Sequence, residues 1–72
     1  MDTTLAIGLT VNGAAMDVPG GISVAALLEH LGLDRRKVAV ERNEEIVPRS
    51  QYEATGLLQS DRLEIVHFIG GG

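Results

Sequence analysis

The sequence predicts a small α+β domain in which one amphipathic helix packs across one face of a mixed sheet of four or five strands. Three observations support this fold class. The 72 residues are enough for one hydrophobic core but not for two. Segments near both ends alternate apolar with small or polar residues, as strands with one buried face do. Between them lies one segment whose apolar residues recur with helical spacing.

The first predicted element is an antiparallel hairpin. Apolar residues alternate with small or polar ones over residues 5–11, and the alternation resumes over residues 14–18. Asn12 and Gly13 lie between the two segments, and this pair readily takes the positive backbone angles of a tight turn. Pro19 ends the second strand, because proline has no N–H group to donate to a sheet.

The helix is predicted at residues 24–31. Ser23 precedes it and is a good N-cap, and Gly32 follows it where a left-handed residue often ends a helix. One helical face is apolar and consists of Val24, Leu27, Leu28 and Leu31. We therefore expect Leu27 and Leu28 to be buried beneath the helix.

The second half of the chain supplies the other strands. Alternation predicts a third strand near residues 38–41, a short edge strand at residues 46–47 and a last strand over residues 62–69. Residues 49–60 carry mixed signals, with a short helical turn expected within Gln51–Leu58. This order of elements is that of the β-grasp, or ubiquitin-like, fold, although other small α+β sheets share it.

The predicted domain organisation is simple. A β-grasp domain covers residues 1–69, and residues 70–72 form a flexible C-terminal glycine tail. The Gly-Gly-Gly end has no side chains with which to pack.

Composition argues against several classes of protein. Ten acidic residues against six basic ones give a net charge of -4, the wrong sign for binding nucleic acid. The absence of cysteine excludes a disulfide scaffold and a thiolate zinc site. No apolar run approaches the roughly 20 residues of a membrane helix, and no leader precedes the first strand. We expect a cytoplasmic protein that binds neither nucleic acid nor membranes.

No group of residues suggests a catalytic or metal site in the chain itself. His30 and His67 are isolated in the sequence, without the spacing of metal ligands or of a nucleophile and its base. Gly20 and Gly21 lack the lysine of a phosphate-binding loop. The basic run at residues 35–37 is most simply a solvated turn. We therefore expect no catalytic residue and no bound metal.

The chain end offers a different chemistry. Gly70 and Gly71 have no side chains, so they could thread a narrow channel into another protein's active site. The Gly72 carboxylate is ionised at neutral pH and can attack an activated phosphate. Once adenylated, it would donate its acyl group to a sulfur or amine nucleophile. The simpler alternative is a frayed tail without a function.

Four segments, in the right order, resemble ThiS, the sulfur carrier family of thiamine thiazole biosynthesis. They are the family's "AV…N…IVPR" block at residues 38–49, its helix at residues 24–28, its last strand at residues 60–66 and the final Gly71-Gly72. The opening hairpin, with Val11-Asn12-Gly13, also looks like the start of that family. The chain departs from the family pattern at Ser23 for threonine, Tyr52 for tryptophan and Ser60 for glycine.

The resemblance implies a mechanism. A ThiF-type adenylating enzyme would use ATP and Mg²⁺ to convert the Gly72 carboxylate into an acyl adenylate. A persulfide sulfur donor would then replace AMP and leave a thiocarboxylate, which delivers sulfur to a ThiG-type thiazole synthase. On this hypothesis the chain is a protein co-substrate without a permanently bound cofactor, and it is not an enzyme.

Alternation in the last strand suggests where partners dock. If Leu63 and Ile65 face the helix, then Val66 and Phe68 lie on the open face of the sheet, beside the tail. We expect this pair to form an apolar docking patch. In the alternative, the strand twists near its end and Phe68 enters the core.

Two other functions are compatible with the sequence. The small subunit of molybdopterin synthase also ends in Gly-Gly on a β-grasp domain. The second alternative is a β-grasp binding module that is not a carrier, in which the terminal glycines have no function. The IVPR segment and the short chain favour the thiamine sulfur carrier.

Overall fold

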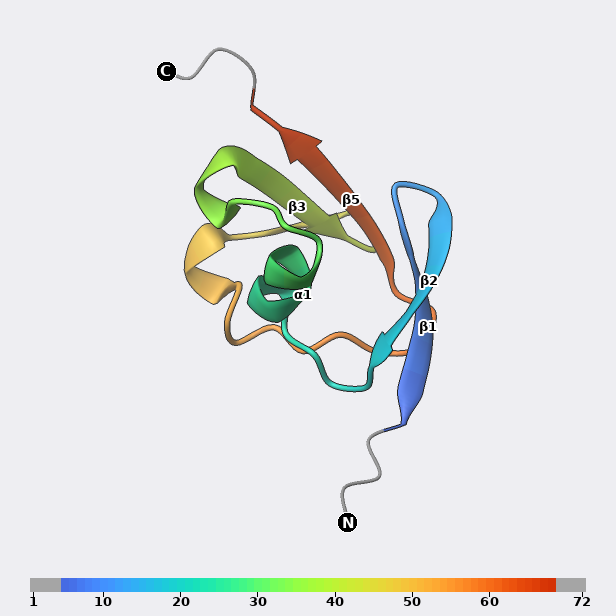
Figure 1. Ribbon diagram of the computed structural model, residues 1–72. Helices are drawn as coiled ribbons and strands as arrows, with labels where there is room; N and C mark the ends of the chain where they lie inside the picture. Colours follow the sequence, from blue (N-terminus) through green and yellow to red (C-terminus); the bar gives the residue numbers. More distant parts are fainter. Residues whose placement is uncertain (1–4, 69–72) are drawn as a thin grey trace.

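The computed structural model describes residues 5–68 and contains one five-stranded mixed sheet with one α-helix on one face (Figure 1). The predicted α+β architecture is confirmed. The elements, in chain order, are β1 (Ala6–Val11), β2 (Ala14–Pro19), α1 (Val24–His30), η1 (Arg35–Lys37), β3 (Val38–Arg42), β4 (Glu45–Val47), η2 (Arg49–Gln51) and β5 (Arg62–His67). The two η elements are single turns of 3-10 helix.

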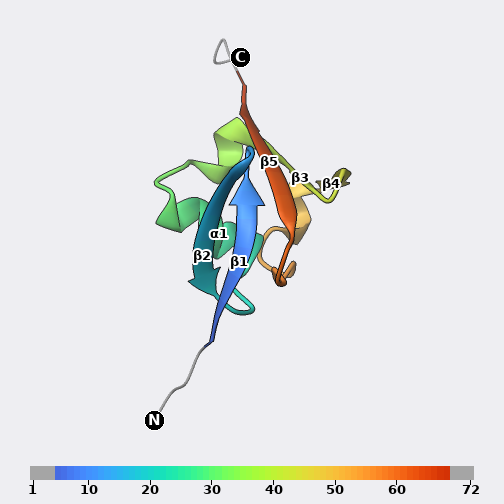
Figure 2. The ribbon, with the colours of Figure 1, turned by 90° about the vertical axis from the view of Figure 1, so that its right-hand side faces the viewer.

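The last strand lies in the middle of the sheet. The strand order is β2-β1-β5-β3-β4, with β1 and β5 parallel and every other neighbouring pair antiparallel. Figure 2 shows β5 beside β1, with α1 behind the sheet. The chain therefore leaves the described domain from the sheet's central strand and not from an edge.

The β1–β2 hairpin closes at the predicted turn. Asn12 and Gly13 have φ angles of 51° and 84°, and Val11 pairs with Ala14 on either side of them. Two consecutive positive φ angles belong to the turn whose twist matches that of the strands.

The helix has the predicted caps. The Ala26 N–H donates to the Ser23 hydroxyl at 3.0 Å, and Gly32 follows with φ 73°. The helix ends at His30, one residue before the predicted end, because Leu31 serves as the C-cap. Leu27 and Leu28 are buried, as expected.

The core lies between α1 and the sheet. Its buried residues are Leu9, Val18, Val24, Ala25, Leu27, Leu28, Val38, Val40, Val47, Tyr52, Leu57, Leu63 and Ile65. Tyr52 is the largest of the fully buried side chains, and its hydroxyl donates to the Val38 carbonyl at 3.3 Å. The tyrosine thus fills core volume and still satisfies its polar atom.

Two sequence-based boundaries differ in the structure. The helical turn lies at Arg49–Gln51 and so begins before the predicted segment Gln51–Leu58; Pro48, whose ring fixes its φ near the observed −61°, precedes it as the N-cap. The last strand ends at His67. Its predicted final residue, Ile69, lies outside the described residues, as does the predicted tail.

Candidate functional site

The glycines expected to carry the chemistry, Gly70, Gly71 and Gly72, lie outside the described residues. The structure instead shows the base from which that segment departs. The Phe68 N–H donates to the Lys37 carbonyl at 2.9 Å, and His67 pairs with Val38 just before it. Strand β5 is therefore held by β3 and by the end of η1 up to the last described residue.

The two residues expected to dock partners are both exposed. Val66 keeps 59% and Phe68 keeps 56% of its surface accessible, whereas Leu63 and Ile65 on the same strand are buried against α1. Phe68 therefore does not enter the core of the described domain. Whether this surface binds a partner stays a prediction.

The open face of the sheet changes character along β3 and β5. Nearest the chain end, Val66 pairs with Ala39. The next pair on that face is Glu41 opposite Glu64, two like charges in register. These two carboxylates, with Glu44 and Arg62, line an open recess of about 350 Å³. An apolar zone near the chain end thus gives way to a charged zone farther along the strand.

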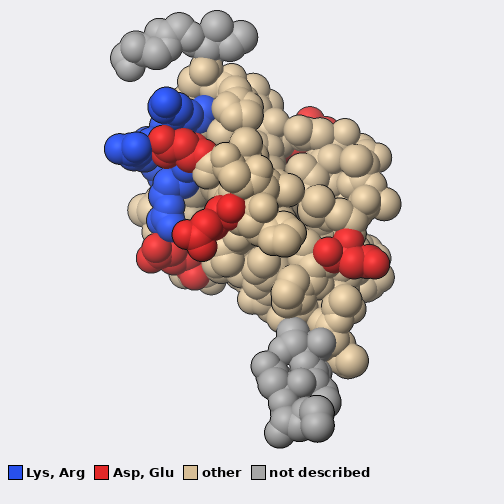
Figure 3. Space-filling model, viewed as in Figure 1, with Lys and Arg blue, Asp and Glu red and all other residues tan. Residues whose placement is uncertain are grey.

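Basic residues gather on another side of the molecule. In Figure 3, Lys and Arg side chains cover the side that carries η1 and η2. Asp34 and Glu53 lie among them, with Arg36 bound to Asp34 at 3.0 Å and Arg35 to Glu53 at 3.1 Å. The hydrogen bonds from Arg36 lower the pKa of Asp34 to about 2. The predicted solvated turn is thus a 3-10 turn, with Asp34 as its N-cap.

A buried carboxylate holds the start of β5. Asp61 accepts from Arg42 Nε at 2.8 Å, from Asn43 Nδ2 at 3.0 Å and from the Leu58 N–H at 2.8 Å. Burial raises the pKa of Asp61, but these donors outweigh it and hold the pKa below its ordinary value. No local pattern in the sequence predicts this structural role of Asp61. Its only signal was its place in the segment that resembles the family's last strand.

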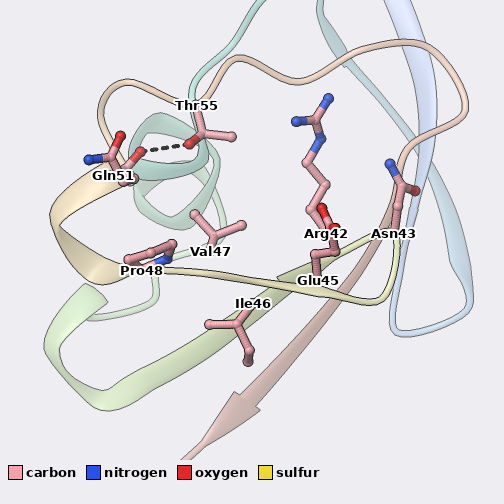
Figure 4. A pocket seen from close by; sticks show the side chains of 8 residues that line it. All are labelled: Arg42, Asn43, Glu45, Ile46, Val47, Pro48, Gln51 and Thr55. Carbon is pink, nitrogen blue, oxygen red and sulfur yellow. Dashed lines mark hydrogen bonds between the residues drawn. The ribbon is translucent and has the colours of Figure 1, made fainter.

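A second open recess, also of about 350 Å³, lies between β4 and the loop that follows it (Figure 4). Its lining residues are Arg42, Asn43, Glu45, Ile46, Val47, Pro48, Gln51 and Thr55. The Thr55 hydroxyl is engaged, since it donates to the Gln51 carbonyl at 2.8 Å. The lining contains neither a cysteine nucleophile nor a histidine base.

Over residues 5–68 no three His, Asp or Glu side chains come together as a possible metal site. His30 ends α1 and His67 ends β5, and both are exposed. No helix in this part of the chain is long and apolar enough to cross a membrane.

The chain is similar to proteins of known families. The model of the ThiS family matches residues 9–72. A thiazole synthase of Paramagnetospirillum magneticum is 53% identical over 64 residues, and these make up 89% of this chain but only 20% of that protein. The sulfur carrier protein ThiS of Bacillus subtilis is 42% identical over 50 residues, covering 69% of this chain and 76% of that one.

A solved structure shares the fold. The crystal structure of the thiamine biosynthesis protein ThiS from Geobacter metallireducens matches with a TM-score of 0.79 at 35% sequence identity. The match covers 92% of this chain and 100% of the other.

Proposed function

This chain belongs to the ThiS family of sulfur carrier proteins in thiamine biosynthesis, and from that premise we propose how it accepts and delivers sulfur. The resemblance inferred from the sequence is confirmed, and so is the β-grasp fold. Members of this family are carriers and not catalysts. We therefore favour this function over the two alternatives, a molybdopterin synthase small subunit and a non-carrier binding module.

The reacting group is the Gly72 carboxylate. One of its oxygens attacks the α-phosphorus of ATP in the active site of a ThiF-type enzyme with Mg²⁺, and pyrophosphate leaves. A persulfide sulfur then attacks the acyl carbon and AMP leaves. A thiol then attacks the donor's sulfur in the remaining sulfur–sulfur bond, forms a disulfide with it and releases the thiocarboxylate. In this proposal ATP and Mg²⁺ are used by the partner enzyme and not by this chain, and the proposed location of these steps is the cytoplasm.

The observation that carries this proposal is the family match, which runs through residue 72 and so includes the three glycines. The last described residue also supports it. The Phe68 N–H donates to the Lys37 carbonyl, so the chain is held to the domain up to Phe68. Gly72 lies four residues beyond Phe68, and four residues span at most about 14 Å. A partner must therefore bind the domain close to Phe68 in order to reach the carboxylate.

The exposed pair Val66 and Phe68 is the proposed docking patch for that contact. It lies on the strand that leads into the tail, and an exposed apolar pair gains free energy when a partner removes it from water. The adenylating enzyme and the thiazole synthase would both bind here, since each must place the same carboxylate in its active site.

A thiazole synthase of the ThiG type is the proposed sulfur acceptor. The chain spans only a fifth of the length of the thiazole synthase that it resembles. A carrier-like segment and the rest of that synthase are therefore parts of one protein in that organism. This arrangement supports a functional interaction between the carrier and a thiazole synthase.

The test is intact-protein mass spectrometry after incubation with the adenylating enzyme, ATP, Mg²⁺ and a persulfide donor. We expect one oxygen to be replaced by sulfur at Gly72, and no such product from a chain that lacks Gly72. The matched control is Glu29→Ala on the exposed side of α1, which leaves the product unchanged. ATP–pyrophosphate exchange at a normal rate with the shortened chain would overturn the proposal.

A further inference from the structure

The turn between β1 and β2 is bound to the strand that leads into the tail. Asn12 Nδ2 donates to the Ile65 carbonyl at 3.1 Å, and Asn12 Oδ1 accepts from the Ile65 N–H at 2.8 Å. The Asn12 N–H also donates to the Leu63 carbonyl at 2.8 Å. The side-chain amide thus continues the β1–β5 pairing after the β1 backbone has turned away. We call this contact the Asn12–Ile65 pairing.

The same turn contains Asn12-Gly13, and asparagine deamidates most readily when glycine follows it. The backbone nitrogen of the following residue can attack the side-chain carbonyl carbon and expel ammonia, which forms a cyclic imide. Water then opens the imide at either carbonyl and leaves an aspartate or an isoaspartate. Glycine in the following position permits this attack, because it has no Cβ to obstruct the approach.

Gly13 meets these conditions in the structure. It is exposed, and a Cβ built there would have no heavy atom within 4 Å, so the space beside its backbone is open. The reacting carbon belongs to the Asn12 carboxamide, which is turned toward Ile65. We propose that Asn12 is a site of spontaneous deamidation that the Asn12–Ile65 pairing restrains, and that its conversion loosens β5.

The restraint follows from geometry. The carboxamide must leave Ile65 before its carbon can rotate toward the Gly13 nitrogen. The reaction then proceeds only through the fraction of molecules in which the pairing is open, and its rate is the rate of the unpaired chain multiplied by that fraction. The stability of the β1–β5 contact therefore sets the lifetime of Asn12.

The consequence falls on β5. In the aspartate product an oxygen replaces the Nδ2 donor and faces the Ile65 carbonyl oxygen, so one hydrogen bond becomes a repulsion. In the isoaspartate product an extra backbone carbon enters the two-residue turn between Val11 and Ala14. Both products weaken the hold on the strand that carries Val66 and leads to Phe68.

The chain provides its own control in Asn43. This residue also has a positive φ, 52°, and its side chain also binds β5, since Asn43 Oδ1 accepts from the Arg62 N–H at 2.9 Å. The residue after it is Glu44, whose side chain obstructs attack by the backbone nitrogen. Deamidation should therefore be confined to Asn12.

The experiment ages the full chain in mildly alkaline buffer, beside a synthetic peptide of residues 9–17 as the unpaired reference. Peptide mass spectrometry locates the gain of one mass unit. We expect it at Asn12 and not at Asn43, at a rate about tenfold or more below that of the peptide, because the open state is rare. Urea below the unfolding transition should raise the rate toward the peptide's value.

A matched pair of variants separates opening of β5 from general loss of stability. Leu63→Ala weakens β5 beside the pairing, while Leu27→Ala removes the same atoms from the helix. We expect faster deamidation in Leu63→Ala than in Leu27→Ala when urea brings both to equal stability. In the purified deamidated chain, amide exchange should quicken in β5 and stay unchanged in α1.

Three results would overturn the inference. They are equal rates in the folded chain and the peptide, conversion of Asn43 as fast as Asn12, and unchanged exchange in β5 after conversion. A fourth result would do the same: if no product forms while the peptide converts fully, even in urea, Asn12 is not a modification site. None of these outcomes bears on sulfur transfer, which is tested separately.

Discussion

At the scale of single residues, β5 and the loop before it depend on side chains that bind backbone atoms. Asn12 binds Ile65, Asn43 binds Arg62 and Asp61 binds the Leu58 N–H. Each of these polar side chains accepts a hydrogen bond from a backbone N–H group and so takes the place of a backbone acceptor. Substitutions here should therefore act on stability more than exposed polar residues usually do.

Asp61→Asn should destabilise the domain by about 2–3 kcal/mol, because it removes the charge that Arg42 pairs with inside the protein. Since the folded pKa of Asp61 is lowered, its contribution is complete above the unfolded value of about 4 and is lost as the pH falls through the folded value. Urea unfolding from neutral to acidic pH measures this. The variant should lose part of the acid dependence. An identical acid dependence in both proteins would contradict it.

Ser60→Gly should stabilise the domain by about 0.5–1 kcal/mol, because Ser60 has a φ of 71°, where residues with a Cβ are strained. This angle also accounts for the glycine that the family usually has at this position. The control is Gly32→Ala, which adds a Cβ at φ 73° and should lower stability by a similar amount. Urea midpoints of the two variants should move in opposite directions, and movement in the same direction would refute the explanation.

At the scale of elements, α1 shows how a short helix depends on its buried face. It has only seven residues, too few to be stable in isolation, so packing against the sheet must stabilise it. Leu27 and Leu28 belong to its buried face, and both are at most 1% exposed.

Leu27→Ala and Leu28→Ala should each cost about 2–5 kcal/mol, through lost apolar contact and the cavity left behind. Glu29→Ala, on the exposed side of the helix, should change stability by less than about 0.5 kcal/mol. Thermal and urea unfolding measure all three variants. Comparable losses at the three positions would mean that the helical face has been assigned wrongly.

At the scale of the whole molecule, the fold separates the part that is stable from the part that reacts. Every buried core residue lies between Leu9 and Ile65, while the proposed chemistry lies at Gly72. The exposed residues Val66 and Phe68 lie between the two. Docking and chemistry should therefore be separable from folding by mutation.

Phe68→Ser should weaken binding to the adenylating enzyme and to the thiazole synthase together, with the thermal midpoint nearly unchanged. The physical reason is that the side chain is exposed in the free domain and would be buried only in the complexes. Leu58→Ser is the matched control. Leu58 is 61% exposed but precedes β5, whereas Phe68 follows the other end of that strand. Calorimetric titration should show normal binding for this control, whereas a loss in both variants would remove the special role of Phe68.

Gly71→Val should block adenylation while the unfolding curve stays unchanged, because it adds a side chain where the partner's channel is expected to admit backbone only. ATP–pyrophosphate exchange gives the rate. The control Ala15→Val, which places a valine at an exposed position in β2, should leave the rate unchanged. Normal exchange with Gly71→Val would show that no narrow channel encloses the tail.

The sequence by itself determined the helix, the β1–β2 hairpin, the buried and exposed faces of β5 and the family. These features follow from local periods, from caps and turns, and from segments that match in order. Only the tertiary structure decided that β5 enters the sheet parallel to β1, and that Asn12 pairs with Ile65, 53 residues away. A local pattern shows which face of a strand is apolar, but the neighbour of that strand depends on how all the elements close one core together. The turn at Asn12 could thus be predicted from two residues, whereas its hold on β5 could not.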